Sequence, residues 1–265
     1  MKKLISLPHG IFLVVGPTGS GKTTTLHALL AHINTPERKI WTAEDPVEIT
    51  QPGLQQVQVK PKIGLDFSAA MRSFLRADPD VILIGEMRDR ETSHIGIEAS
   101  LTGHLVFSTL HTNSAPETIT RLLDLGIEPL NFADALLGIL AQRLVRTLCN
   151  NCKKACIASP EEIAHLENVY GPEQFKPLIA DKTRVTLYRP CGCKKCGNIG
   201  YHGRTGIHEL LLGTPAMKKL IASKSTVSRI HDLAVKEGML TLKQDGIEKI
   251  LKGQIDLRQL RKVTI

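Results

Sequence analysis

The segment Ile11-Phe12-Leu13-Val14-Val15-Gly16-Pro17-Thr18-Gly19-Ser20-Gly21-Lys22-Thr23 sets the architecture of this chain. Five apolar residues without alternation are typical of a strand buried on both faces. The glycine-rich part matches the phosphate-loop pattern at every defined position, and Thr24 to His32 continues as a predicted helix. Backbone N–H groups and a helix N-terminus can surround an anion only where glycine lets the chain turn closely around it. We therefore expect a nucleotide-binding loop rather than an ordinary glycine-rich turn.

ATP and Mg²⁺ are the expected ligands of this loop. Lys22 should meet the β- and γ-phosphates, and the Thr23 hydroxyl should join the Mg²⁺ shell. The predicted nucleotide-binding residues form one continuous run: Gly16, Pro17, Thr18, Gly19, Ser20, Gly21, Lys22, Thr23 and Thr24.

Further apolar runs extend the same pattern along the chain. Strands are predicted at 39–43, 81–85 and 104–109, and helices at 67–75, 90–101 and 115–123. Strands that alternate with helices indicate an α/β domain with a largely parallel sheet. From Pro215 onward the sequence predicts amphipathic helices, which are broken at Gly238 and Gly253.

Length and composition fit a globular chain with more than one domain. The 265 residues are 42% hydrophobic and 23% charged, and no apolar run is long enough to span a bilayer. Because no secretory signal is recognisable at the N-terminus, we expect a cytoplasmic protein. Residues 1–148 contain 14 Lys and Arg against 15 Asp and Glu, whereas 149–265 contain 20 against 11. The basic excess favours an acidic partner surface, or it is simply a solvated lysine-rich face.

Polar residues follow three of the predicted strands. Glu44 follows 39–43, Glu86 follows 81–85, and His111 follows 104–109. In a parallel sheet these strand ends reach the same edge as the phosphate loop, so one carboxylate can order the Mg²⁺ shell while another acts on the attacking water. Taken singly, each carboxylate is equally well a helix cap or a surface charge, and a lone histidine is more often structural.

In combination, these segments resemble the four sequence boxes of the secretion ATPase superfamily, which drives type II secretion and type IV pilus assembly. The Walker A loop is 16–23 and the Asp box is 41–48 (WTAEDPVE). The Walker B box corresponds to 75–89 (LRADPDVILIGEMRD), and the His box to 101–113 (LTGHLVFSTLHTN). The likeness continues to the helices around Gly238 and Gly246 and so covers nearly the whole chain.

This resemblance implies a RecA-like motor domain that works as a ring, usually a hexamer, on an inner-membrane assembly platform. It implies that Glu44 is the catalytic base, that Glu86 acts on Mg²⁺ or water, and that His111 senses the γ-phosphate. Peripheral association with the inner membrane would come through the platform proteins. Four arginines are further candidates for contacts across the ring or to phosphate: Arg76, Arg88, Arg143 and Arg146.

All six cysteines fall between 149 and 196, and four of them form two CxxC pairs, Cys149 with Cys152 and Cys193 with Cys196. Four thiolates make a closed structural Zn²⁺ site, whereas free thiols or a redox pair are the alternatives. The pattern resembles the tetracysteine motif of secretion and pilus-extension ATPases, which retraction ATPases typically lack. Cys156 and Cys191 are surplus, so the sequence leaves open which four bind metal.

The expected domains are a RecA-like core at 1–148, a zinc-binding segment at 149–206 and a helical subdomain at 207–265. Family members normally carry a further domain upstream of the motor, and we expect it to be absent from this chain because the first strand begins almost at Met1. Type II secretion is the favoured function, and type IV pilus extension is the close alternative. A nucleic-acid-binding factor, such as a DNA-uptake protein, is a second class, but neither aromatic interleaving nor a recognition helix supports it.

Overall fold

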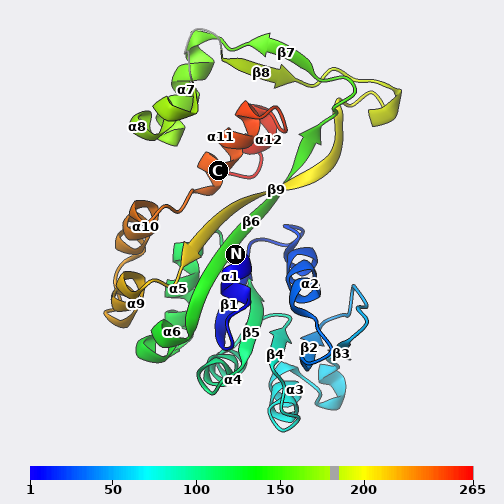
Figure 1. Cartoon of the computed structure of the whole chain (residues 1–265), viewed down its shortest axis with the longest axis vertical. Coiled ribbons are helices and arrows are strands. Elements are labelled where there is room, and N and C mark those ends of the chain that lie inside the picture. Colours follow the sequence, from blue (N-terminus) through cyan, green and yellow to red (C-terminus); the bar gives the residue numbers. More distant parts are fainter. Residues whose placement is uncertain (180–184, 265) are drawn as a thin grey trace. The chain divides into compact units, whose positions relative to one another are not determined.

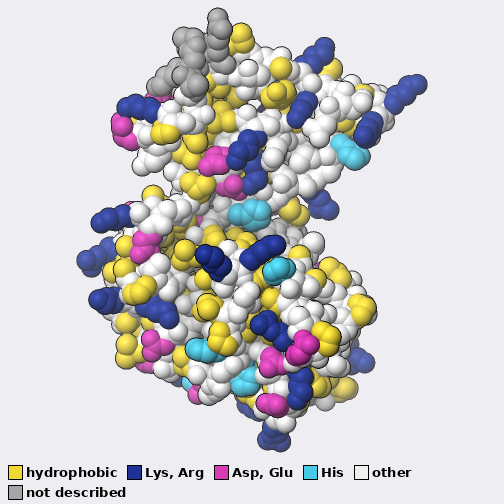
Figure 2. Space-filling view, in the orientation of Figure 1, with side chains coloured by type: hydrophobic (Ala, Val, Ile, Leu, Met, Phe, Trp, Pro, Cys, Tyr) yellow, Lys and Arg dark blue, Asp and Glu magenta, His cyan; other side chains and the backbone are white. Residues whose placement is uncertain are grey.

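The computed structural model describes residues 1–179 and 185–264, which form two units (Figure 1). The first unit contains Met1–Ala141 and Leu210–Met239, and the second contains Gln142–Glu209 and Leu240–Ile265. Lys and Arg side chains are spread over the visible face of both units (Figure 2). No helix in the described part of the chain has the length and apolar character needed to cross a membrane.

A seven-stranded sheet with the order β3-β2-β4-β5-β1-β6-β9 organises the first unit. Strands β1 to β5 pair in parallel, and β1 also pairs in parallel with β6. The strands have these bounds: β1 (Gly10–Val15), β2 (Ile40–Glu44), β3 (Leu54–Gln58), β4 (Val81–Ile84), β5 (Leu105–Leu110), β6 (Leu136–Leu148) and β9 (Tyr201–Leu212). Residues of β6 and β9 belong partly to each unit.

Helices cover both faces of this sheet because its central strands are buried on both sides. All six residues of β1 are buried. Phe12 and Val14 join the core under α1 and α2, whereas Leu13 and Val15 join the core that includes α3 to α6, α9 and α10. The helices of this unit have these bounds: α1 (Lys2–Ile5), α2 (Lys22–Ile33), η1 (Pro61–Ile63), α3 (Phe67–Phe74), α4 (Arg90–Leu101), α5 (Ala115–Asp124), α6 (Pro129–Ala135), α9 (Pro215–Ala222) and α10 (Val227–Lys236).

Polar caps explain where several of these helices begin. Asp66 accepts from the backbone of Ala69 at the start of α3, and Asp89 accepts from that of Thr92 at the start of α4. Such side chains satisfy N–H groups that have no partner inside the helix. The cap at Asp89 fixes the chain three residues after Glu86, one of the predicted catalytic residues.

The second unit has a smaller core of its own, which includes Leu166, Phe175, Ile207 and Ile250. Two antiparallel strands pair within it, and Ser159 starts its longest helix with a capping box to Glu162. Its elements are β7 (Lys154–Ile157), α7 (Pro160–Tyr170), α8 (Pro172–Phe175), η2 (Lys176–Leu178), β8 (Thr186–Arg189), η4 (Lys194–Cys196), α11 (Leu242–Leu251) and α12 (Leu257–Arg261).

The fold class expected from the sequence is confirmed, and the predicted strands agree with the observed ones to within about one residue. One difference concerns the helices after Pro215. The sequence predicts them as a single subdomain at 207–265, whereas α9 and α10 belong to the first unit and α11 and α12 to the second. The reason lies in their apolar residues: Met217 and Ile230 pack in the first core, and Ile247 and Leu260 pack in the second.

Candidate active site

The phosphate loop joins the end of β1 to the start of α2. Gly19 and Gly21 have φ of 78° and 85°, in the left-handed region that side chains disfavour. A Cβ on Gly19 would have open space around it, so the backbone conformation, not crowding, requires glycine there. Lys22 Nζ donates to the carbonyl oxygens of Gly16 at 2.8 Å and Pro17 at 3.3 Å. The ammonium group thus lies over the loop that the sequence predicts to bind phosphate.

Glu86 and His111 come together at the neighbouring strand ends. Glu86 follows β4, His111 follows β5, and His111 Nε2 lies 3.2 Å from Glu86 Oε1. Arg88 contacts the other carboxylate oxygen at 2.7 Å, and this carboxylate raises the pKa of the Arg88 guanidinium. The Glu86 side chain is 15% exposed, so it is sheltered yet reachable from solvent.

Hydroxyl groups hold this pair of strand ends in register. Ser108 Oγ donates to the carbonyl of Ile84 at 2.8 Å, and Thr109 Oγ1 donates to that of Gly85 at 2.7 Å. The backbone N–H of Gly16 donates to the carbonyl of Leu110 at 3.2 Å. The start of the phosphate loop is therefore tied to the residue that precedes His111.

Gly85 brings the ends of β2 and β4 into close approach. Its backbone N–H donates to the Ala43 carbonyl at 2.8 Å. A Cβ at position 85 would lie 3.0 Å from that carbonyl oxygen and 3.4 Å from Glu44 Cα. Because glycine has no side chain, Glu44 and Glu86 can occupy adjacent strand ends.

Glu44 is held by a buried polar network. It is 4% exposed, and its Oε1 accepts from Thr42 Oγ1 at 2.6 Å and from Gln56 Nε2 at 2.9 Å. Its Oε2 lies 3.2 Å from Nε2 of His27, which projects from α2 and is 3% exposed. The carboxylate is therefore fixed by groups from two strands and a helix.

Four of the cysteines form a compact group in the second unit. The Sγ atoms of Cys149, Cys152, Cys193 and Cys196 all lie within 4.8 Å of one another. Three of the Sγ separations are 3.9 Å for Cys149 to Cys193, 3.8 Å for Cys152 to Cys196, and 3.8 Å for Cys193 to Cys196. Tetrahedral zinc with Zn–S bonds of about 2.3 Å requires separations of about 3.8 Å. The donor set therefore fits zinc in number and spacing.

Hydrogen bonds favour the thiolate form of Cys193, whereas burial raises the pKa of the Cys152 thiol to about 11. Backbone N–H groups of Gly192 and Gly200 donate to Cys152 and Cys196 at 3.2 and 3.3 Å. The Asn151 side chain donates to Cys193 Sγ at 3.3 Å and lowers the pKa of this thiol to about 6. Of the two surplus cysteines, Cys156 donates to the Leu187 carbonyl and Cys191 is exposed.

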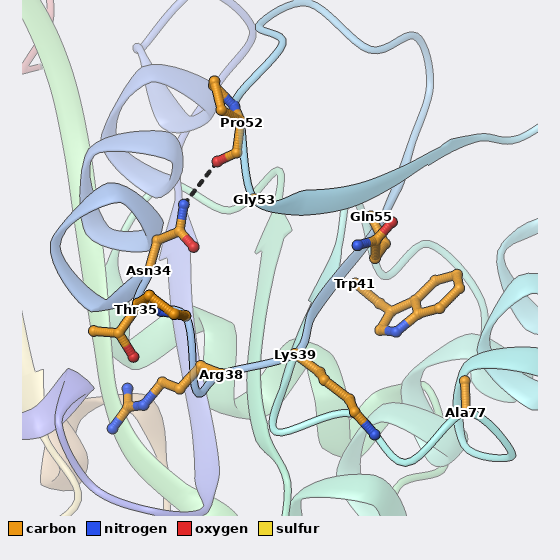
Figure 3. A pocket seen from close by; sticks show the side chains of 10 residues that line it. Asn34, Thr35, Arg38, Lys39, Trp41, Pro52, Gly53, Gln55 and Ala77 are labelled. Atoms are coloured by element: carbon orange, nitrogen blue, oxygen red, sulfur yellow. Dashed lines mark hydrogen bonds between the residues drawn. The ribbon is translucent and has the colours of Figure 1, made fainter.

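A pocket of about 660 Å³ lies away from these groups (Figure 3). Its lining includes Arg38 and Lys39, which precede β2, and Pro52 and Gly53, which precede β3. Asn34 Nδ2 donates to the Pro52 carbonyl at 2.8 Å, and Figure 3 draws this hydrogen bond among the residues that line the pocket. The starts of these parallel strands are at the edge opposite the phosphate loop, so this pocket is separate from the candidate active site.

A match to a family model connects this arrangement with known proteins. The model described as type II/IV secretion system protein matches residues 1–262. The chain belongs to this family. Type II secretion system ATPase E of Vibrio cholerae is 46% identical over 263 residues, which cover 99% of this chain and 50% of that protein. Type IV pilus assembly ATPase PilB of Thermus thermophilus is 46% identical over 264 residues, which cover 100% of this chain and 29% of that protein.

Among solved structures, the pilus retraction motor PilT with bound ADP is similar to this chain. The TM-score is 0.70 at 29% sequence identity, and the match covers 99% of this chain and 63% of that one. The resemblance inferred from the four boxes is thus confirmed. The chain spans about half or less of the length of the curated relatives named here.

The four candidate arginines lie in different parts of the chain. Arg76 is exposed and lies between α3 and β4, at the edge opposite the phosphate loop. Arg143 is buried and Arg146 is exposed, and both lie on the part of β6 that belongs to the second unit. Arg88 contacts Glu86, a predicted catalytic residue, at 2.7 Å.

No motif in the sequence points to His27, Gln51 or Gln56 as site residues. All three belong to the network around Glu44. The signal available in the sequence is weak, because His27 lies within an otherwise apolar helix face and the two glutamines lie in or beside a polar edge strand. Their meeting depends on how α2 packs over β2.

Proposed function

We propose that this chain binds and hydrolyses ATP as the motor part of a type II secretion ATPase. The observation that carries the proposal is the contact between Glu86 and His111 at strand ends that are tied to the phosphate loop. Support also comes from the 46% identity to type II secretion system ATPase E. That relative is named an ATPase, and the catalytic residues expected from the sequence lie at one edge of one sheet.

The phosphate loop would hold the nucleotide through its backbone N–H groups and Lys22. Lys22 now donates to loop carbonyls, and it would exchange these contacts for the β- and γ-phosphates. Thr23 and Glu86 supply the hydroxyl and carboxylate oxygens that suit Mg²⁺. When bound, Mg²⁺ would neutralise charge on the phosphates.

Each of the three predicted catalytic residues would have a different role in hydrolysis. Glu44 would take a proton from the attacking water as general base, and Glu86 would order the water or the metal. His111 Nε2, which lies 3.2 Å from Glu86 Oε1, would donate a hydrogen bond to the γ-phosphate when that group is present. His111 would therefore report whether the γ-phosphate is present.

We further propose that Cys149, Cys152, Cys193 and Cys196 bind a structural zinc ion. The sulfur separations near 3.8 Å and the N–H donors to sulfur support this assignment. With four protein ligands, no position would remain for substrate, so zinc would stabilise the fold of the second unit.

The partners proposed for the assembled protein follow from the relatives, which are ATPases of secretion and pilus machines. We expect a homo-oligomeric ring, a hexamer by analogy with the family, that acts on inner-membrane platform proteins. The proposed location is the cytoplasm, peripheral to the inner membrane.

Two other functions make different predictions. Type IV pilus extension is supported by the 46% identity to PilB, and restoration of pilus growth instead of secretion in a deletion strain would favour it. A nucleic-acid-binding role predicts a concentrated basic surface, whereas the basic side chains on the visible face are spread out (Figure 2). Steeply salt-dependent DNA binding would support that role, and absence of binding at low salt would exclude it.

The direct test of ATP binding compares the purified chain with Lys22→Ala. The substitution removes a charged donor to phosphate, so we expect ATP affinity to fall by about 10- to 100-fold and phosphate release to fall with it. Lys218→Ala is a matched control, because Lys218 donates to the Asp134 carbonyl at 2.8 Å, outside the phosphate loop. Equal ATP affinity in Lys22→Ala and the control would contradict the proposal.

A further inference from the structure

His27 lies between two side-chain oxygens in the interior of the first unit. Its Nδ1 is 2.8 Å from Gln51 Oε1, and its Nε2 is 3.2 Å from Glu44 Oε2. The histidine and the glutamate are only 3% and 4% exposed. Each ring nitrogen therefore faces an oxygen at hydrogen-bond distance with little access for water.

The orientation of the Gln51 amide determines whether His27 Nδ1 donates or accepts a hydrogen bond. Gln51 Nε2 donates to the backbone carbonyl of His27 at 3.2 Å, so Oε1 is the atom that faces the ring. Turning the amide over would place its oxygen against that carbonyl oxygen. Because Oε1 can only accept, Nδ1 carries a proton and donates it.

The hydrogen bonds of Gln56 determine which Glu44 oxygen faces His27. Its Nε2 donates to Glu44 Oε1 and to the Ile49 carbonyl, each at 2.9 Å, and its Oε1 accepts from the Gln51 backbone at 2.8 Å. Thr42 also donates to Glu44 Oε1. The Oε1 atom therefore accepts two hydrogen bonds, and Oε2 is left to His27.

With Nδ1 protonated, a neutral imidazole would present a lone pair to the Glu44 carboxylate. We propose that His27 is instead a doubly protonated imidazolium that donates from Nε2 and holds Glu44 as a carboxylate. The charged group in contact with the ring is Glu44 of β2, and the partner from the segment after β2 is the neutral Gln51. Asp45 and Glu48 of that segment are exposed to water.

This assignment gives His27 a positioning role that rests on the proposed function of Glu44 as base. The imidazolium favours the ionised carboxylate, which is the form able to accept a proton from water. It also fixes the geometry, because Oε1 is fully used and the remaining lone pair lies on Oε2. The positive charge weakens the base but keeps it available at lower pH.

Nitrogen NMR of the whole chain labelled with ¹⁵N-histidine tests the proposal without any assay of hydrolysis. At pH 7.5, where exposed histidines are mostly neutral, we expect both ring nitrogens of His27 to show protonated signals. The His27 signal is assigned by His27→Gln, or by correlation to its backbone if that variant does not fold. A ring with one protonated and one unprotonated nitrogen would overturn the assignment.

Glu44→Gln provides the decisive variant. Thr42 and Gln56 donate to Oε1, so the new amide nitrogen takes the place of Oε2 and faces His27 Nε2. The ring should then become neutral and keep only its Nδ1 proton. If both nitrogens stay protonated in Glu44→Gln, the charge on His27 does not depend on Glu44, and the proposal fails.

A kinetic comparison tests the positioning role. For His27→Gln we expect kcat to fall more than KM changes, and the acid limb of the kcat profile to move to higher pH. His94→Gln is the matched control, because His94 pairs with Glu98 at 3.3 Å on an exposed helix surface. An unmoved acid limb in His27→Gln would refute the role. Loss of hydrolysis in the parent chain would instead refute the proposed function and leave the NMR result standing.

Discussion

Glu44 and Glu86 end neighbouring strands, but their carboxylates are held in different ways. Glu44 is buried and contacts the side chains of Thr42, Gln56 and His27. Glu86 is 15% exposed and contacts the side chains of Arg88 and His111, which are 70% and 42% exposed. The first carboxylate is therefore part of the folded interior, whereas the contacts of the second can exchange when a ligand binds.

Substitutions of Glu44 should separate its two roles. Glu44→Gln keeps an acceptor for Thr42 and Gln56, so we expect near-normal stability but turnover lowered by about 100-fold or more. Glu44→Ala leaves buried donors without their acceptor and should lower the free energy of unfolding by roughly 3 kcal/mol. Urea denaturation and phosphate release measure the two effects. Equal stability of both variants would show that the network contributes little to folding.

At the scale of elements, the short apolar strands do most to place the site. β1, β2, β4 and β5 each end at a functional group or within two residues of one, and their runs of apolar residues made these positions predictable. Parallel pairing then brings the ends to one edge. The phosphate loop, Glu86 and His111 could be predicted for this reason.

Other features could not be predicted because the local sequence contains no motif or periodicity that indicates them. β3 reads Leu-Gln-Gln-Val-Gln and lies at the edge of the sheet, where burial is incomplete. The pairing of His27 with Glu44 joins a helix to a strand 17 residues away. Such contacts arise from tertiary packing, which neither periodicity nor spacing encodes. The four-cysteine group was selected by its paired spacing, but the exclusion of Cys156 and Cys191 required coordinates.

Removal of zinc should act on the elements around the cysteines. We expect about one Zn²⁺ per chain, and chelation should increase hydrogen exchange across 149–206. Exchange in the phosphate loop should change little, because no described residue of that segment belongs to the cores of the first unit. Cys149→Ser with Cys193→Ser should reproduce the effect, and the exposed Cys191→Ser is the control. Zinc-free protein with unchanged exchange would disprove the metal site.

At the scale of the whole molecule, the chain divides its tasks between two units with separate cores. The predicted catalytic residues lie in the first unit and the cysteines lie in the second. The basic excess belongs to residues 149–265. Nucleotide chemistry and metal binding are therefore expected to respond to different substitutions.

Ring formation should appear as a concentration effect. If neighbouring subunits complete each nucleotide site, specific activity should rise with protein concentration as rings form, because assembly follows mass action. Light scattering measured in the same samples gives the mass of the particles. Constant specific activity across a transition from monomer to ring would mean that each chain works alone.

The most direct test of the account measures ATP binding and phosphate release by Glu86→Gln beside the parent chain. The substitution keeps the shape of the side chain but removes the negative charge that faces His111 and Arg88. We predict ATP affinity within about threefold of the parent and Mg²⁺-dependent phosphate release lowered by about 100-fold or more. Phosphate release by Glu86→Gln at the rate of the parent chain would contradict the assignment of this sheet edge as the active site.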